Sequence, residues 1–93
     1  MKSEELKNYL DDLERVKEWP SKRNKGQFQL LVLKYLASKF SPGMTYTEKE
    51  VNALLNQYHT FNDPALLRRE MVERRLLERK RDGSAYWLTP SSS

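Results

Sequence analysis

The apolar residues of the first eighteen positions recur three and four places apart. This spacing is typical of an amphipathic helix, and Ser3 is a candidate N-cap. The proline at position 20 restricts Trp19 to extended conformations, which ends the helix there. We therefore expect a helix over residues 3–18, with an apolar stripe formed by Leu6, Tyr9, Leu10, Leu13 and Val16.

A second helix is predicted over residues 26–40. Its apolar stripe is the widest in the chain, so we expect it to lie at the centre of the core. Residues 41–43 (SPG) end it, because proline and glycine interrupt a helical pattern. The next residues, 44–46, favour a short extended stretch.

Two more helices follow, each with a clear start. Thr47 and Glu50 have the spacing of a capping box, which predicts a helix over residues 47–57. Asp63-Pro64 provides a good N-cap and a proline at the first helical position. We therefore expect a fourth helix over residues 63–75.

A β-hairpin is predicted at the end of the pattern. Residues 76–81 and 84–88 flank Asp82-Gly83, and such a pair between two strand-like runs is typical of a two-residue type I′ turn. That turn fixes the expected register of the two strands. It places Leu77 opposite Leu88, Glu78 opposite Trp87, and Arg79 opposite Tyr86.

The order helix, short strand, helix, helix, hairpin resembles a winged helix. The predicted fold is mainly α with a small β-hairpin: a winged-helix-like domain with an extra N-terminal amphipathic helix. Ninety-three residues suffice for one domain. We divide the chain into an N-terminal helical extension (1–19), the winged-helix-like domain (20–89) and a disordered tail (90–93).

Five blocks of sequence, in order, resemble the domain of unknown function 2087 family. Together they cover about residues 19–88. The resemblance implies a bacterial protein of an uncharacterised family whose members are sometimes fused to helix-turn-helix regulators. It therefore implies a role near transcription. The blocks are 19–25 (WPSKRNK), 46–52 (YTEKEVN), 67–72 (LRREMV), 77–79 (LER) and 82–87 (DGSAYW).

The net charge of +4 is unevenly distributed. Residues 1–18 carry four basic and six acidic side chains, whereas the remainder carries 13 basic and 7 acidic ones. A basic domain behind an acidic leader suits an anionic partner such as nucleic acid, although a solvated surface would have the same composition.

The hairpin and the basic loop before the second helix are the best candidates for nucleic-acid contact. A winged-helix hairpin meets the phosphate backbone or a minor groove. The alternative is that charged residues on an edge strand only prevent aggregation. The expected contacts are Lys22, Arg23 and Lys25 of the loop, Arg69 of the fourth helix, and Arg79, Lys80 and Arg81 of the hairpin.

The fourth helix gives weaker support to DNA binding. Spacing at 100° per residue places Leu66, Arg69, Glu70 and Glu73 on its outward face, and two carboxylates there would be repelled by phosphates. Arg68 falls within the apolar arc instead. We expect it to be partly buried and paired with Glu48 or Glu50.

Little in the chain suggests catalysis. There are no cysteines, and His59 is the only histidine, which favours a hydrogen-bonded structural role over a metal site shared with Asp63. Glu70 and Glu73 stand one helical turn apart among arginines, which is typical of surface ion pairs. We expect no enzyme activity, no cofactor, no metal and no small-molecule substrate.

The sequence thus favours a cytoplasmic, transcription-related module that binds double-stranded DNA. Salt-sensitive binding to duplex is the expected behaviour, weakened by changing Arg79, Lys80 and Arg81 together. A protein-interaction or dimerisation module is the alternative, and a homodimer through the N-terminal helix is one form of it. The longest apolar run, Leu30–Leu33, is too short to span a membrane.

Overall fold

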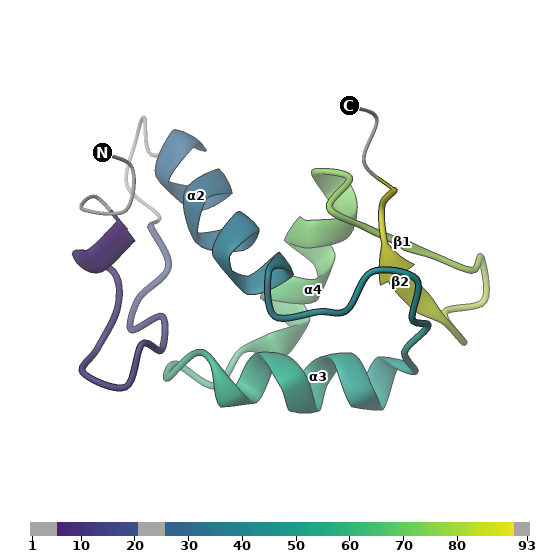
Figure 1. Cartoon of the computed structure of the whole chain (residues 1–93), viewed down its shortest axis with the longest axis horizontal. Helices are drawn as coiled ribbons and strands as arrows, with labels where there is room; N and C mark the ends of the chain where they lie inside the picture. The colour runs from purple at the N-terminus through teal and green to yellow at the C-terminus, as the bar shows by residue number, and fades with distance from the viewer. Residues whose placement is uncertain (1–5, 21–25, 91–93) are drawn as a thin grey trace.

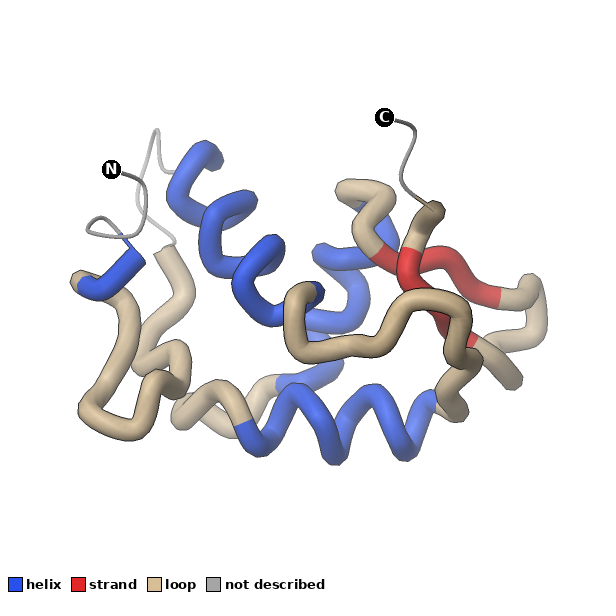
Figure 2. The backbone as a smooth tube through the Cα atoms, in the orientation of Figure 1, coloured by secondary structure: helices blue, strands red, loops and turns tan. Residues whose placement is uncertain are grey.

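A computed structural model of the chain describes residues 6–20 and 26–90. Within them, three helices precede a two-stranded antiparallel sheet, and α2 and α4 pack together above α3 while the hairpin lies at the opposite end from the N-terminal segment (Figures 1 and 2). This architecture confirms the mainly α, winged-helix-like fold with a small hairpin. The elements are α2 (Gly26–Ala37), α3 (Glu48–Gln57), α4 (Pro64–Glu73), β1 (Leu77–Arg79) and β2 (Tyr86–Leu88).

One continuous core joins all of these elements. α2 contributes most of its apolar stripe to the core, as expected for a central helix, although its α-helical part ends at Ala37 rather than at Phe40. No helix formed by residues 6–20 and 26–90 is long and apolar enough to cross a lipid bilayer. The fully buried core side chains are Val16, Val32, Leu33, Leu36, Val51, Leu55, Leu67, Met71 and Leu77.

The two predicted helix starts are confirmed at atomic level. The backbone N–H of Glu50 donates to the Thr47 hydroxyl at 3.1 Å, and the Glu50 carboxylate accepts from the Thr47 N–H at 2.9 Å. The Asp63 carboxylate accepts from the N–H of Leu66 at 3.1 Å, with Pro64 at the first helical position. These side chains satisfy amides that have no partner inside the helix, so α3 and α4 begin where the local sequence places them.

The end of α4 turns the chain directly into the hairpin. Arg75 adopts a left-handed conformation (φ 63°), its N–H donates to the carbonyl of Val72, and the N–H of Leu76 donates to the carbonyl of Met71. This is a Schellman motif, formed here without the usual glycine. It fixes the angle at which β1 leaves α4 and so sets the two elements side by side.

The hairpin has the predicted register but not the predicted turn. Leu77 lies opposite Leu88, Glu78 opposite Trp87 and Arg79 opposite Tyr86, as expected. The prediction of a type I′ turn is wrong. That turn needs a positive φ at both central residues, and in the pair Asp82-Gly83 only Gly83 has one, 76°. The loop instead spans four residues, 81–84, between paired Lys80 and Ala85.

The short extended stretch before α3 pairs with the hairpin. Tyr46 forms a bridge to Tyr86, with reciprocal backbone N–H to carbonyl bonds of 2.7 Å each. β2 therefore lies between Tyr46 and β1, which is the place of the central strand in a winged-helix sheet. The hairpin is thus hydrogen-bonded to the loop before α3 and is also connected directly to the end of α4.

The predicted N-terminal helix over 3–18 is wrong beyond its start. Within the described part of that stretch, helical backbone is confined to Leu6 and Lys7. A turn follows, in which Leu10 forms a bridge to Val16 and Glu14 has a φ of 62°. Of the expected tail 90–93, all but Pro90 lies outside the described residues.

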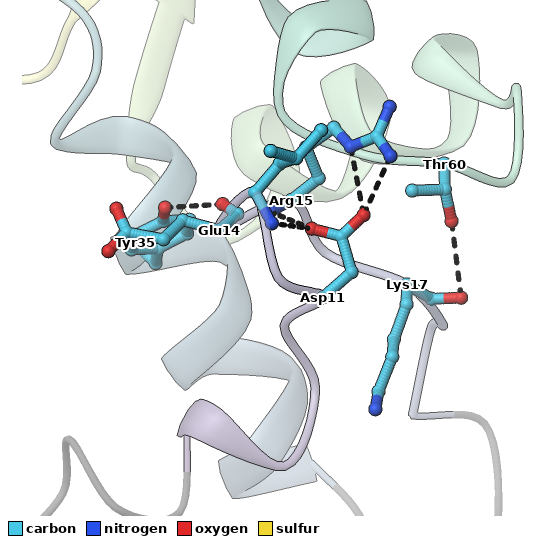
Figure 3. Close-up of polar contacts among 7 residues, drawn as sticks. Asp11, Glu14, Arg15, Lys17, Tyr35 and Thr60 are labelled. Atoms are coloured by element: carbon cyan, nitrogen blue, oxygen red, sulfur yellow. Dashed lines mark hydrogen bonds and ion pairs between the residues drawn. The ribbon is translucent and has the colours of Figure 1, made fainter.

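Polar contacts explain this turn (Figure 3). The Asp11 carboxylate accepts the backbone N–H groups of Leu13 and Arg15 at 2.9 and 2.8 Å, and the Arg15 guanidinium donates to it as well. An aspartate that captures nearby amides competes with helix formation. The Tyr35 hydroxyl of α2 also donates to the carbonyl of Glu14 at 2.6 Å, which holds the turn on the domain.

After the turn, Val16 forms a parallel β-bridge to the loop after α3. The N–H of Val16 donates to the carbonyl of Tyr58 at 2.7 Å, and the N–H of Thr60 donates to the carbonyl of Val16 at 2.9 Å. Val16 itself is fully buried in the core. The apolar stripe on which the expected homodimer rested is therefore not formed over residues 8–18.

The Asp11 turn predicts an acid-sensitive part of the folding stability. Hydrogen bonding from the backbone of Arg15, more than any other favourable contact, lowers the pKa of Asp11 below its ordinary value of 3.8. A lowered folded-state pKa contributes stability that is present above the unfolded value and lost as pH falls through the folded value. The free energy of unfolding, measured with urea, should decrease less between pH 6 and pH 2 in Asp11→Asn than in the wild type. Equal decreases would contradict this role of Asp11.

Candidate nucleic-acid interface

An open groove separates α4 from the hairpin. It encloses about 370 Å³ and lies where the chain turns from α4 into β1. Its charged lining residues are Arg68, Arg69 and Glu73 of α4 and Arg79 of β1. Two residues that the sequence proposed for nucleic-acid contact, Arg69 and Arg79, therefore share one groove.

Arg69 lies on the exposed side of α4. Within residues 6–20 and 26–90, its guanidinium forms no hydrogen bond or ion pair. A free guanidinium on the outer face of the second helix of a helix-turn-helix can reach a base edge or a phosphate. The predicted placement of Arg69 is confirmed, while its contact with nucleic acid stays a prediction.

Glu70 does not face the groove, contrary to the helical-wheel expectation. It is half-buried, and its carboxylate pairs with the Nη2 of Arg74 at 3.2 Å. Arg74 in turn donates to Gln29 of α2 at 2.5 Å, so this cluster belongs to the contact between α2 and α4. Of the two carboxylates expected on the groove side, only Glu73 remains there.

Arg68 is half-buried and paired with α3, as the sequence predicted. Its Nη2 lies 3.7 Å from the carboxylate of Glu48, and its Nη1 donates to the side-chain oxygen of Asn52. Glu48 is therefore the partner, because Glu50 is engaged in the capping box. The side chain of Arg68, only 18% exposed, connects α3 to α4 and fixes one wall of the groove.

This connection predicts a difference between two adjacent arginines. Arg68→Ala removes the contacts with α3 and should lower the free energy of unfolding by about 1–2 kcal/mol, or roughly 5–10 °C in Tm. Arg69→Ala removes an exposed, unpaired side chain and should change it by less than about 0.5 kcal/mol. Thermal unfolding of both variants checks this, and equal midpoints would contradict the structural role of Arg68.

The hairpin carries three exposed basic side chains, Arg79, Lys80 and Arg81. The Nη1 of Arg79 donates to the carbonyls of Lys80 and Arg81 at 3.3 Å each, so this arginine holds the hairpin loop while it lines the groove. Among the described residues, the side chains of Lys80 and Arg81 form no hydrogen bond or ion pair. Their charges are therefore available to an anionic partner.

One acid lies at the tip of the hairpin. Hydrogen bonds from the side chain and backbone of Ser84 lower the pKa of Asp82 below its ordinary value of 3.8. The same hydrogen bond to the Ser84 N–H shapes the loop that replaces the expected type I′ turn. Asp82 therefore has a structural role beside the basic residues.

Lys22, Arg23 and Lys25, the predicted basic loop, lie outside the described residues. The groove contains four residues that the sequence did not single out for this site: Ala65, Arg68, Val72 and Tyr86. The strand register placed Tyr86 opposite Arg79, so this neighbour could have been inferred. Arg68 could not, because its position in the groove depends on how α4 packs against α3.

His59 is a structural residue. Its ring is buried, with Nδ1 2.6 Å from the carbonyl of Leu55 and Nε2 accepting from the N–H of Asp63 at 2.9 Å. These partners require the tautomer protonated at Nδ1. His59 thereby connects the end of α3 to the N-cap of α4.

Comparison with protein-family models finds one match. The model of a family described as an uncharacterized protein conserved in bacteria matches residues 15–88. Comparisons with curated proteins and with solved structures find no match. The matched range includes α2, α3, α4 and the hairpin, and so contains the whole groove.

Proposed function

The chain belongs to the bacterial family named domain of unknown function 2087, and we propose that it binds double-stranded nucleic acid through the groove between α4 and the hairpin. The observation that supports this most directly is that Arg69 and Arg79, from separate elements, line the same open groove. Two further exposed cations, Lys80 and Arg81, follow Arg79 in the chain. We propose a non-enzymatic, cytoplasmic role in transcriptional regulation.

The proposed complex follows from where the cations lie. α4 enters or approaches the major groove with Arg69, and the hairpin lies along the adjacent phosphate backbone with Lys80 and Arg81. The pairing of Glu70 with Arg74 supports this arrangement, since it removes one carboxylate from the approaching face. Glu73 in the groove and Asp82 at the tip of the hairpin are the acids that remain beside these cations.

Contacts within the free protein hold α4 and the hairpin in fixed positions. Arg68 joins α4 to α3, the Schellman motif joins α4 to β1, and Tyr46 pairs with β2. A surface that is already ordered loses less conformational entropy on binding. The basic residues are therefore presented at positions that binding need not rearrange.

The test is a titration of labelled duplex by fluorescence anisotropy at several salt concentrations. Contacts of Lys80 and Arg81 with two phosphates would give a slope of log affinity against log salt of about −2, and phosphate contacts by further cations would make it steeper. Binding in the micromolar range at low salt with such a slope is the expected result. An absence of binding to duplex at 50 mM salt would refute the proposal.

A protein-interaction module is the second candidate, and a different hollow favours it. A cavity of about 780 Å³ lies between the loop before α3 and the end of β2, and its lining is largely apolar, with Pro42, Trp87, Leu88 and Pro90. Exposed apolar hollows are typical of ligand and protein contacts. Failure to bind duplex would make this surface the better candidate.

Self-association remains a prediction, although the helix that suggested it is not formed over residues 8–18. Tyr9 instead packs against Phe28 of α2, with ring centroids 5.9 Å apart. Sedimentation at two protein concentrations tests the homodimer. A monomer at high micromolar concentration would remove it.

A further inference from the structure

Few side chains on α4 are able to read base sequence. Its polar residues are Arg68, Arg69, Glu70 and Glu73, and the helix contains no Asn, Gln, Ser or Thr. Arg68 is engaged by α3, and Glu70 is engaged by Arg74. Arg69 is therefore the residue of α4 that is left to make the paired hydrogen bonds by which arginine recognises guanine.

The remaining acid does not supply a second reader. Glu73 stands one turn after Arg69 on the same groove wall. A carboxylate can accept from the amino group of cytosine, but it must first approach two rows of phosphates that repel it. One well-placed base contact discriminates by about five- to a hundredfold, whereas sequence-specific proteins prefer their sites by about 10³- to 10⁷-fold.

The hairpin is built to contact the backbone of the duplex. Lys80 and Arg81 are exposed on the loop that Arg79 holds through the two carbonyl contacts of its Nη1. Arg79 thereby uses one nitrogen to order the loop, and the rest of its guanidinium lines the groove. Lysine and arginine on a short loop bind phosphates as charges, and phosphate contacts carry no direct sequence information.

We propose that this domain recognises the backbone and shape of double-stranded nucleic acid and tolerates most base sequences. The inference rests on the proposed function and specifies its partner: duplex of any sequence, because among residues 6–20 and 26–90 only Arg69 is placed to read a base, and one arginine contact gives a small preference. Arg69 supplies that limited preference. Arg79 acts as the positioning residue for the hairpin loop.

The test selects from a pool of 20-base-pair duplexes with random sequence, using the full chain, and then measures affinity for several unrelated duplexes. The expected result is a consensus of at most two base pairs and dissociation constants that differ by less than a hundredfold. A consensus of three or more base pairs, or a larger spread, would overturn this inference while leaving duplex binding intact. No retention of any duplex at low salt would overturn the proposed function and this inference with it.

Two variants examine the roles of the arginines in the same assay. Arg69→Ala should weaken binding and erase any remaining base preference. Arg79→Lys keeps the charge, but its side chain is one bond shorter and does not place a nitrogen where Nη1 contacts the two loop carbonyls. It should therefore weaken duplex binding several-fold with an unchanged salt slope. In the free Arg79→Lys protein, faster hydrogen exchange at the Gly83 amide would report the loosened loop; unchanged exchange and affinity would overturn the positioning role.

Discussion

Replacing His59 with alanine is expected to lower the free energy of unfolding by roughly 2–4 kcal/mol. The imidazole is buried, and its two nitrogens bond the carbonyl of Leu55 and the N–H of Asp63. Alanine leaves a cavity and deprives the Asp63 amide of its acceptor just before α4 begins. For a domain of this size the expected loss is about 10–20 °C in Tm.

Two conservative variants separate the contributions of the ring nitrogens. Asparagine at position 59 can reach the carbonyl of Leu55, and glutamine can reach the amide of Asp63, so each should retain part of the stability. Asn56→Ala, an exposed change on α3, is the control and should stay within about 0.5 kcal/mol. Chemical unfolding of the four variants measures these differences. A stable His59→Ala protein would show that the contact between α3 and α4 does not depend on this ring.

The double variant Lys80→Ala/Arg81→Ala is expected to weaken duplex binding about thirtyfold at low salt, at roughly 1 kcal/mol for each charged contact. The salt slope should fall by about 2, because two phosphate contacts are lost. Neither exposed side chain forms a hydrogen bond or ion pair among the described residues, and the attraction of Lys80 to the exposed Asp82 carboxylate is screened by water, so the folded state should keep its stability. Keeping Arg79 in this variant preserves the order of the loop.

A matched control distinguishes a local contact from a general effect of charge. Lys7→Ala/Lys34→Ala removes the same charge from exposed positions on the N-terminal segment and α2, which contribute no residue to the groove or the hairpin. It should leave the salt slope unchanged and weaken binding only slightly. Equal losses in both double variants would mean that the hairpin is not the contact surface.

Much of the fold could be predicted because its signals are local. The Thr47 and Glu50 pair satisfies amides within its own helical turn, and Asp63-Pro64 does the same for α4. The strand register followed from centring the hairpin on Asp82-Gly83, and the observed four-residue loop has the same centre. The predicted contact residues Arg69, Arg79, Lys80 and Arg81 are all exposed in the structure, although Arg79 shares its strand face with the buried Leu77.

The errors concern residues whose partners are distant in sequence or compete locally with the backbone. The periodicity of residues 3–18 fitted a helix, but Asp11 captures nearby amides and Val16 pairs with the loop after α3. The helical wheel placed Glu70 outward, yet Arg74 and Gln29 draw that cluster toward α2. Periodicity predicts which side of a helix or strand is apolar. It does not predict which residues of other elements contact the side chains next to that apolar side.

The starts of α3 and α4 and the register of the two strands could be predicted from the amino-acid sequence, since each depends on capping or turn residues within a few positions. The assembled fold was needed to show that Arg69 and Arg79 share a groove, that Glu48 and not Glu50 pairs with Arg68, and that Val16 of the N-terminal segment is paired with the loop after α3. Those features depend on contacts between residues far apart in the chain, which form only when the whole core is assembled.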